Sequence, residues 1–196
     1  DSSYLIGSED LGRLRYRGPD GEGCYNDAFV TLGHTRLAIL DPSPAGKQPM
    51  RSPCGRFVIT FNGEIYNYRE LRNDLCGANH TFRTRTDTEE LIAAFKQYGK
   101  KCLNYLRGMF AFAIWDRYER TLFVARDRCG ERPFFYWFDG RRFVFASELK
   151  GLIPRLPETP RLNAAVVDMY LHFQYVPEPW TLLEGVHKLP AAHFLH

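Results

Sequence analysis

Residues 56–68 read RFVITFNGEIYNY, and this stretch decides how the chain folds. Its apolar part, residues 57–61, is almost continuous, which predicts a β-strand buried on both faces. Asn62 and Gly63 follow that strand directly. An Asn-Gly pair is the commonest hairpin signal, but the chain continues into a predicted helix over residues 68–75 and not into a second strand. The pair therefore indicates a functional strand end, where a glycine lets a ligand approach the backbone.

The patterns on either side of this stretch predict an α+β fold. A second helix follows Thr86-Asp87, and Gly99 ends it. Because most of the later strands follow one another through hairpins, the two predicted sheets are mainly antiparallel, with helices covering them in a layer order that the pattern leaves open. The other predicted elements are strands over residues 109–115, 121–126, 134–138 and 142–146, a helix over 8–15 with Ser8 as its N-cap, a turn over 17–23, two strands over 28–40 with a break near 33–35, a short helix capped by Ser147, and a helix over 162–173.

The composition excludes several classes of protein. The chain has 196 residues, of which 44% are hydrophobic, enough for one domain with a sizeable core. The net charge of +3 is small and the basic residues form no stripe, so no nucleic-acid partner is expected. No apolar run approaches the ~20 residues of a membrane-spanning helix, so no membrane partner is expected either. Five widely spaced cysteines and six histidines without metal-ligand spacing predict no metal site and a reduced, cytoplasmic compartment.

Two segments carry groups that suit the binding and polarisation of a carbonyl compound. The Asn62 side-chain amide and the Gly63 N–H can both donate toward one point, as an oxyanion hole requires. Arg36, at the end of a strand-like segment, can bind a carboxylate through two parallel hydrogen bonds. A lone arginine is, however, more often exposed at a sheet edge, and the pattern leaves both interpretations open.

Acidic residues offer a further binding function with a strong structural alternative. Asp87 can hold a substrate ammonium group, and Glu64 can share that role or be solvated. Thr86-x-x-Glu89 also has the form of a capping box, which by itself would explain an acid in the first turn of a helix.

The remaining reactive side chains favour structural interpretations. His34 is interpreted as a structural histidine. Cys24 and Cys54 lie in predicted loops without an adjacent histidine or helix N-terminus to lower the thiol pKa, so neither is a good nucleophile.

The order of the motifs is more specific than any one of them. Together they resemble the glutamine pocket of class II (N-terminal nucleophile) glutamine amidotransferases, and most closely the glutaminase half of glutamine-hydrolysing asparagine synthetases. The resemblance covers roughly residues 11–196. The segments that carry it are Arg17-Gly18-Pro19-Asp20, Gly33-His34-Thr35-Arg36, Asn62-Gly63-Glu64-Ile65-Tyr66-Asn67, Thr86-Asp87-Thr88-Glu89, Gly108-Met109-Phe110-Ala111-Phe112-Ala113, Ala125-Arg126-Asp127-Arg128 and Ala146-Ser147-Glu148-Leu149-Lys150.

The resemblance implies a four-layer αββα sandwich and a role for each pocket residue. Arg36 would bind the α-carboxylate of glutamine, with a backbone contact at Ile39. Asn62 and Gly63 would form the oxyanion hole, while Glu64 and Asp87 would hold the α-amino group. Ammonia released from glutamine would pass through a tunnel to the protein's own synthetase domain, which would use ATP and Mg²⁺ to convert aspartate into asparagine, AMP and pyrophosphate. A homodimer is also compatible with the resemblance.

Two departures from the family pattern limit this expectation. The family's nucleophile is an N-terminal cysteine whose free α-amino group acts as its base, whereas this sequence begins Asp1-Ser2-Ser3. We therefore expect the chain as written to be inactive and the cysteine to lie upstream of Asp1. No Ser-Gly-Gly-x-Asp-Ser loop for pyrophosphate is present, so residues 1–153 are expected to be the glutaminase domain and residues 154–196 a linker and the start of a truncated synthetase domain.

Two other classes of protein stay open. A β-lactam-synthetase-like ligase would keep this fold with a vestigial glutaminase domain, and the loss of pocket residues would favour it. A non-enzymatic glutamine-binding module would follow if the native protein started at Asp1.

Overall fold

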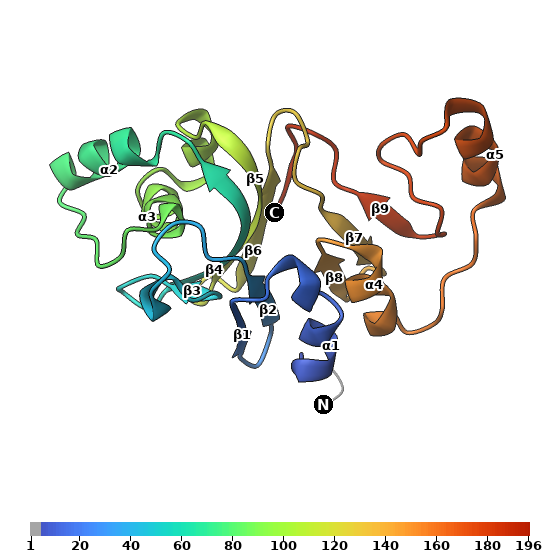
Figure 1. Cartoon of the computed structure of the whole chain (residues 1–196), viewed down its shortest axis with the longest axis horizontal. Coiled ribbons are helices and arrows are strands. Elements are labelled where there is room, and N and C mark those ends of the chain that lie inside the picture. The colour runs from blue at the N-terminus through green and yellow to red at the C-terminus, as the bar shows by residue number, and fades with distance from the viewer. Residues whose placement is uncertain (1–4) are drawn as a thin grey trace.

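The computed structural model describes residues 5–196, so the expectations for Asp1 and Ser2 fall outside the described part of the chain. All of its paired strands run antiparallel, as predicted. They form a five-stranded sheet, a three-stranded sheet and a two-stranded hairpin (Figure 1).

The five-stranded sheet, with the order β10-β6-β5-β4-β3, is the centre of the domain. Its long strands β4 and β5 pair over their whole length, from Phe57 opposite Asp116 to Ile65 opposite Gly108. The bounds of its strands are β3 (Met50–Arg51), β4 (Phe57–Ile65), β5 (Gly108–Asp116), β6 (Thr121–Arg126) and β10 (Phe194–Leu195).

The prediction that the strand ends before Asn62 is wrong, because β4 continues through Asn62 and Gly63 to Ile65. Gly63 explains the continuation. A Cβ atom at this position would lie 2.1 Å from the carbonyl oxygen of Met109, so only glycine allows β5 to stay paired with β4 here.

Two helices cover one face of this sheet, α2 (Tyr68–Gly77) and α3 (Asp87–Tyr98) (Figure 1). Both were predicted, the second from apolar residues at helical spacing, and both are present. Leu75 and Leu91 are fully buried in the core that they form with aromatic residues of the sheet. The other members of this core include Phe57, Ile59, Phe61, Phe110, Phe112, Ile114 and Phe123.

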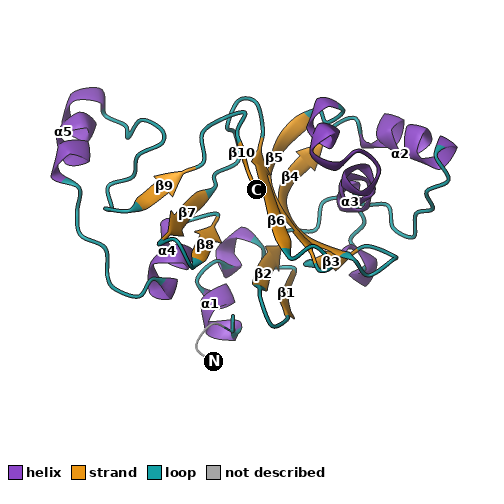
Figure 2. Ribbon diagram, turned by 180° about the vertical axis from the view of Figure 1, so that it is seen from behind, coloured by secondary structure: helices purple, strands orange, loops and turns teal. Residues whose placement is uncertain are grey.

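The second β-layer consists of two separate pieces. One is the hairpin of β1 (Gly21–Asn26) and β2 (Thr31–Arg36). The other is the sheet β8-β7-β9, with β7 (Phe135–Phe138), β8 (Phe143–Ala146) and β9 (Val186–Lys188). The short helices α1 (Ser8–Gly12) and α4 (Leu149–Leu152) lie beside these pieces (Figure 2). The chain therefore forms the predicted αββα sandwich, with helices outside two layers of antiparallel strands.

The hairpin differs from its prediction. The strand β1 begins at Gly21, inside the turn predicted over 17–23, and β2 runs unbroken through Gly33-His34-Thr35. The turn lies instead between the two strands, where the Asp27 carboxylate accepts hydrogen bonds from the N–H groups of Phe29 and Val30. An Asx turn of this kind depends on one side chain and is easily missed in a pattern.

Two predicted helix caps are also wrong. The helix α1 begins after Gly7, whose N–H donates to Asp10, and not after Ser8. The helix α4 begins after Glu148 and not after Ser147. The Glu148 carboxylate does not cap the helix, because it accepts hydrogen bonds from Tyr16 and Arg17.

The last forty residues return to the body of the domain. The helix α5 (Ala164–Phe173) begins after its N-cap Asn163, whose side chain accepts a hydrogen bond from the Val166 N–H. The chain then adds β9 to the smaller sheet and β10 to the larger one (Figure 2). The division of the chain at residue 154 stays a prediction. Among residues 5–196, no helix combines the length and apolar character needed to cross a membrane.

Candidate functional site

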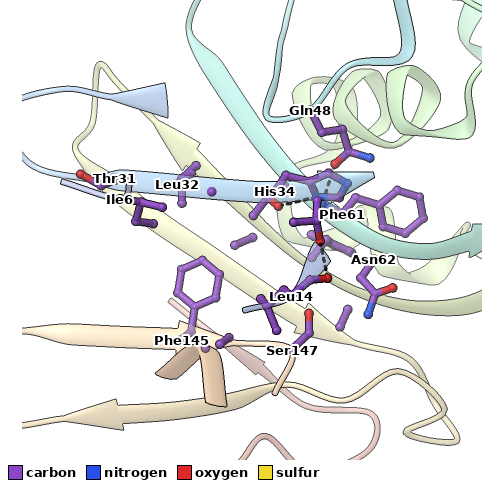
Figure 3. Close-up of a pocket in the computed structure, with 18 of the residues that line it drawn as sticks. Ile6, Leu14, Thr31, Leu32, His34, Gln48, Phe61, Asn62, Phe145 and Ser147 are labelled. Atoms are coloured by element: carbon purple, nitrogen blue, oxygen red, sulfur yellow. Dashed lines mark hydrogen bonds between the residues drawn. The ribbon is translucent and has the colours of Figure 1, made fainter. Parts of the chain in front are cut away.

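A cavity of about 2010 Å³ lies between the layers, and all six residues predicted to form the site line it. They come from three segments that are distant in sequence. The residues are Arg36, Ile39, Asn62, Gly63, Glu64 and Asp87. Figure 3 shows part of the wall, where β2 contributes Leu32 and His34 and the opposite side contributes Phe145 and Ser147.

Asn62 presents an unused hydrogen-bond donor. Successive residues of a strand point to opposite faces, so the ring of Phe61 enters the helix-covered core while Asn62 faces the cavity (Figure 3). The Asn62 Nδ2 atom is buried, and among residues 5–196 it has no hydrogen-bond partner. A buried donor without a partner is costly, so its presence on a cavity wall indicates a ligand-binding group.

Arg36 ends β2 and fastens the loop that follows it. Its Nη1 donates to the Ser43 carbonyl at 2.8 Å, and its Nη2 donates to the Asp41 carbonyl at 2.5 Å and to the Leu40 carbonyl at 3.4 Å. The guanidinium is therefore not exposed at a sheet edge, which was the alternative interpretation of Arg36. Ile39, in the same loop, is 67% exposed.

The Arg17-Gly18-Pro19-Asp20 motif holds the backbone of Arg36 and of the residues that follow it. The Asp20 carboxylate accepts a hydrogen bond from the Ala38 N–H at 2.8 Å, and the Asp20 N–H donates to the Arg36 carbonyl at 3.0 Å. Gly18 allows this approach, because a Cβ there would lie 2.4 Å from the Thr35 carbonyl. This motif, which the sequence left without a role, positions the end of β2.

Asp87 joins the sheet to the first turn of α3. Its Oδ2 accepts a hydrogen bond from the Ile65 N–H at 2.9 Å. Burial raises the pKa of Asp87 to about 6, and the charge of Glu64 adds to the rise against the opposing effect of the Ile65 hydrogen bond. A bound cation would favour the ionised carboxylate and so offset the free-energy cost of burying its charge.

The expected capping box is not formed. Thr86 is the N-cap of α3 but its side chain makes no capping hydrogen bond. The Glu89 carboxylate turns to the preceding segment instead and accepts hydrogen bonds from the N–H groups of Arg83 and Thr84. The pattern Thr-x-x-Glu is shared by both arrangements, and only tertiary contacts distinguish them.

Residues 6–196 match the family of the glutamine amidotransferase domain. The chain belongs to this family. It is 40% identical over 180 residues to glutamine-hydrolysing asparagine synthetase 1 of Bacillus subtilis, covering 91% of this chain and 28% of that protein. It is 35% identical over 185 residues to asparagine synthetase 3 of the same organism, covering 93% and 30%. The chain spans only 28% to 38% of the length of the first curated relatives that it matches.

A solved structure supports the same fold for this amidotransferase domain. The glutamine phosphoribosylpyrophosphate amidotransferase of B. subtilis, solved with ADP and GMP, superimposes with a TM-score of 0.61 at 26% identity. The match covers 76% of this chain and 39% of that one.

Two further polar residues of the amidotransferase domain lie on the cavity wall. Burial, with a contribution from the charge of Arg36, lowers the pKa of His34 to about 4, so the imidazole is neutral at pH 7. Its Nδ1 lies 3.1 Å from Thr60 Oγ1, which agrees with a structural role. Gln48, which sequence reasoning missed, accepts a hydrogen bond from the Phe61 N–H at 2.7 Å and donates to Thr88 at 3.3 Å. A single glutamine in a loop carries no pattern that could have found it.

The cysteines of the described region lie away from the cavity. None of Cys24, Cys54, Cys76, Cys102 and Cys129 is among its lining residues. Within residues 5–196, no three histidine, cysteine or acidic side chains gather closely enough to hold a metal ion.

Proposed function

We propose that this amidotransferase domain hydrolyses glutamine to glutamate and ammonia and supplies the ammonia for the ATP-dependent amidation of aspartate. The observation that carries the proposal is the unpartnered Asn62 amide, which shares one cavity with the Arg36 cation and the buried Asp87 carboxylate. Family membership and the similarity to glutamine-hydrolysing asparagine synthetases support it.

The charges of the cavity complement those of free L-glutamine. Arg36 would bind the α-carboxylate, since a guanidinium forms charge-assisted hydrogen bonds with it, and the loop at Ile39 would add a backbone contact. Asp87 and Glu64 would hold the α-ammonium group. The side-chain carbonyl of glutamine would then lie at Asn62 and Gly63, whose N–H groups would stabilise the tetrahedral oxyanion.

The nucleophile would be a cysteine at the mature N-terminus, on a strand beyond the described residues. Among those residues, β2 pairs along its length with β1 and has one further bridge, from Arg36 to Pro19, while β8 pairs with β7; residues of β2 and β8 line the cavity. Each of these strands is an edge strand of its sheet and contributes to the wall of the cavity. A strand entering it would place its first residue close to Asn62 and Arg36, and the free α-amino group would serve as the base for the thiol.

Ammonia would be used in a second domain, for which we expect ATP and Mg²⁺ as cofactors. The greater length of the relatives supports such a domain. The apolar surface of α5 and of the segment after it also supports a second domain. Here Leu171, Phe173 and Tyr175 are 64%, 58% and 61% exposed. A surface of this kind in a soluble protein family marks an interface.

The test uses the native full-length protein. Intact mass and N-terminal sequencing would show whether a cysteine is the mature first residue, and ammonia release from glutamine would be measured for wild type and Asn62→Ala. We expect an N-terminal cysteine, release of ammonia by wild type and its loss in the variant, while residues 1–196 alone release none. A full-length protein that starts with another residue and releases no ammonia would overturn the proposal and favour the β-lactam-synthetase-like or binding-module alternative.

A further inference from the structure

Asp41 lies in the loop after β2 and contacts three separate segments. Its carbonyl accepts the hydrogen bond from Arg36 at 2.5 Å. One carboxylate oxygen, Oδ1, accepts hydrogen bonds from the N–H and hydroxyl groups of Ser43, at 3.2 and 2.5 Å. The other oxygen, Oδ2, accepts a hydrogen bond from the N–H of Arg85 at 2.8 Å.

The bond to Arg85 cannot be explained by the local turn. The two Ser43 contacts close an Asx-type turn two residues long, and such a turn needs only one carboxylate oxygen. Arg85 is 44 residues further along the chain. Its contact joins the loop that Arg36 holds to the segment that leads into Asp87.

That segment is held firmly on its other side. Glu89 accepts hydrogen bonds from the N–H groups of Arg83 and Thr84, and Arg72, which pairs with the buried Glu90, donates to the Thr84 carbonyl at 2.8 Å. The start of α3 is therefore a fixed support. Asp41 connects the more exposed loop after β2 to this support.

A second contact brings the same two regions together. Gly46 lies between them, and a Cβ there would be 2.0 Å from Arg36 Nη2 and 3.0 Å from the Thr86 side chain. A larger residue here would displace the Arg36 guanidinium from the carbonyl groups that it binds. Gly46 thus lets the guanidinium pack close to the residue before Asp87.

We propose that Asp41 is a positioning residue that fixes the carboxylate-binding Arg36 relative to the ammonium-binding Asp87, and so makes the domain selective for ligands that carry both charged groups on one carbon. The role rests on the proposed binding of glutamine. Asp41 itself touches no ligand in this scheme; it sets the spacing of two groups that do.

The backbone of Asp41 determines which variants are informative. Its φ angle is +48°, in the left-handed region that glycine and asparagine accept readily. Asp41→Gly removes the carboxylate without straining the backbone, and Asp41→Asn keeps one acceptor oxygen of the two. Asp116→Asn is a matched control, because the Asp116 carboxylate also holds a turn, through the N–H groups of Tyr118 and Glu119, and does not line the cavity.

The experiment uses the full-length protein and three ligands. Wild type and variants would be compared for the KM and kcat of L-glutamine, and for inhibition by glutaramate, which lacks the α-amino group, and by 4-aminobutanamide, which lacks the α-carboxylate. For Asp41→Gly we expect the KM for glutamine to rise about tenfold, the kcat to change by less than about threefold, and each inhibition constant to change by less than about threefold. The KM of Asp41→Asn for glutamine should lie between those of wild type and Asp41→Gly. Asp116→Asn should lower thermal stability without changing KM, kcat or the inhibition constants.

Two results would count against the inference in different ways. If Asp41→Gly weakens all three ligands equally, or none of them, Asp41 has only a structural role while the glutaminase assignment stands. If wild type neither binds L-glutamine nor releases ammonia, the proposed function fails and this role fails with it.

Discussion

The two faces of the five-stranded sheet are built from the same strands but differ in almost every property. On the helix-covered face, β4 and β5 contribute large aromatic side chains such as Phe61 and Phe112, which are almost completely buried. On the opposite face the same strands carry the small or polar residues Thr60, Asn62 and Ala111, which line the cavity, while the larger Val58 and Trp115 lie at one end of this face.

This difference shows how one strand can serve stability and binding at once. Because side chains alternate with a period of two, each residue that fills the core is followed by one that faces the cavity. The small side chains leave space between the layers, and the polar ones supply hydrogen-bonding groups. Substitutions on the two faces should therefore separate an effect on folding from an effect on activity.

The largest effect should come from the core face. Phe112→Ala removes a fully buried ring that contacts Phe110 and Phe123, and we expect it to lower the free energy of unfolding by about 3–5 kcal/mol. Chemical denaturation measures this change. Phe138→Ala is the control, because Phe138 is 58% exposed and its loss should cost less than about 1 kcal/mol. Similar losses at both positions would show that the helix-covered face is not the main core.

Asn62→Ala, on the cavity face of the neighbouring strand β4, should change activity much more than stability. The free energy of unfolding should change by less than about 1 kcal/mol, because the deleted amide donor has no partner. The kcat for glutamine in the full-length protein should fall about 10²–10³-fold if the amide stabilises the oxyanion. The exposed Asn26→Ala provides the control for both measurements. A stable variant with normal kcat would remove Asn62 from the reaction.

Arg36→Lys keeps the positive charge at the site but loses the planar fork. Lysine cannot reproduce donation to three carbonyls of residues 40–43 while also binding a carboxylate, so we expect the KM for glutamine to rise about 10–100-fold, which corresponds to about 1.4–2.7 kcal/mol. Steady-state kinetics of the full-length protein tests this. The exposed Arg13→Lys should leave KM unchanged, and an equally small effect at Arg36 would contradict its assignment to the carboxylate.

Asp87→Asn should change stability less than Phe112→Ala does, and in the opposite direction. The folded-state pKa of about 6 lies above the ordinary value of 3.8, so the stability linked to this carboxyl is fully present below pH 3.8 and is lost as the pH rises through about 6. Asparagine avoids the cost of the buried charge. We expect the variant to be more stable than wild type by about 1–3 kcal/mol at pH 7.5, yet to bind glutamine more weakly.

Thermal denaturation between pH 4 and pH 8 would measure this effect. The stability advantage of Asp87→Asn should disappear toward pH 4, where the wild-type carboxyl is protonated. Asp74→Asn, at an exposed position of α2, should change stability at pH 7.5 by less than about 0.5 kcal/mol. A loss of stability in Asp87→Asn at pH 7.5 would show that the hydrogen bond to Ile65 outweighs the cost of burial.

The parts of the fold that depend on local periodicity could be predicted from the sequence. The apolar run before Asn62 and the helical spacing after Thr86 give β4 and α3 because burial of one face requires those patterns. The elements that were missed depend on distant partners. Neither β9 nor β10 has more than three residues, and each forms only because β7 or β6 offers an edge.

In the candidate site too, some features follow from the sequence and others depend on contacts between distant residues. The sequence by itself determined which residue types are available: a guanidinium at Arg36, an Asn-Gly pair at residues 62–63 and a carboxylate at Asp87. Only the tertiary structure decided that they line one cavity, that Glu89 fastens a loop instead of capping a helix, and that Asp41 joins the two sides of the site. The physical reason is that hydrogen bonds and burial act through space, whereas a sequence pattern reports only the neighbours along the chain.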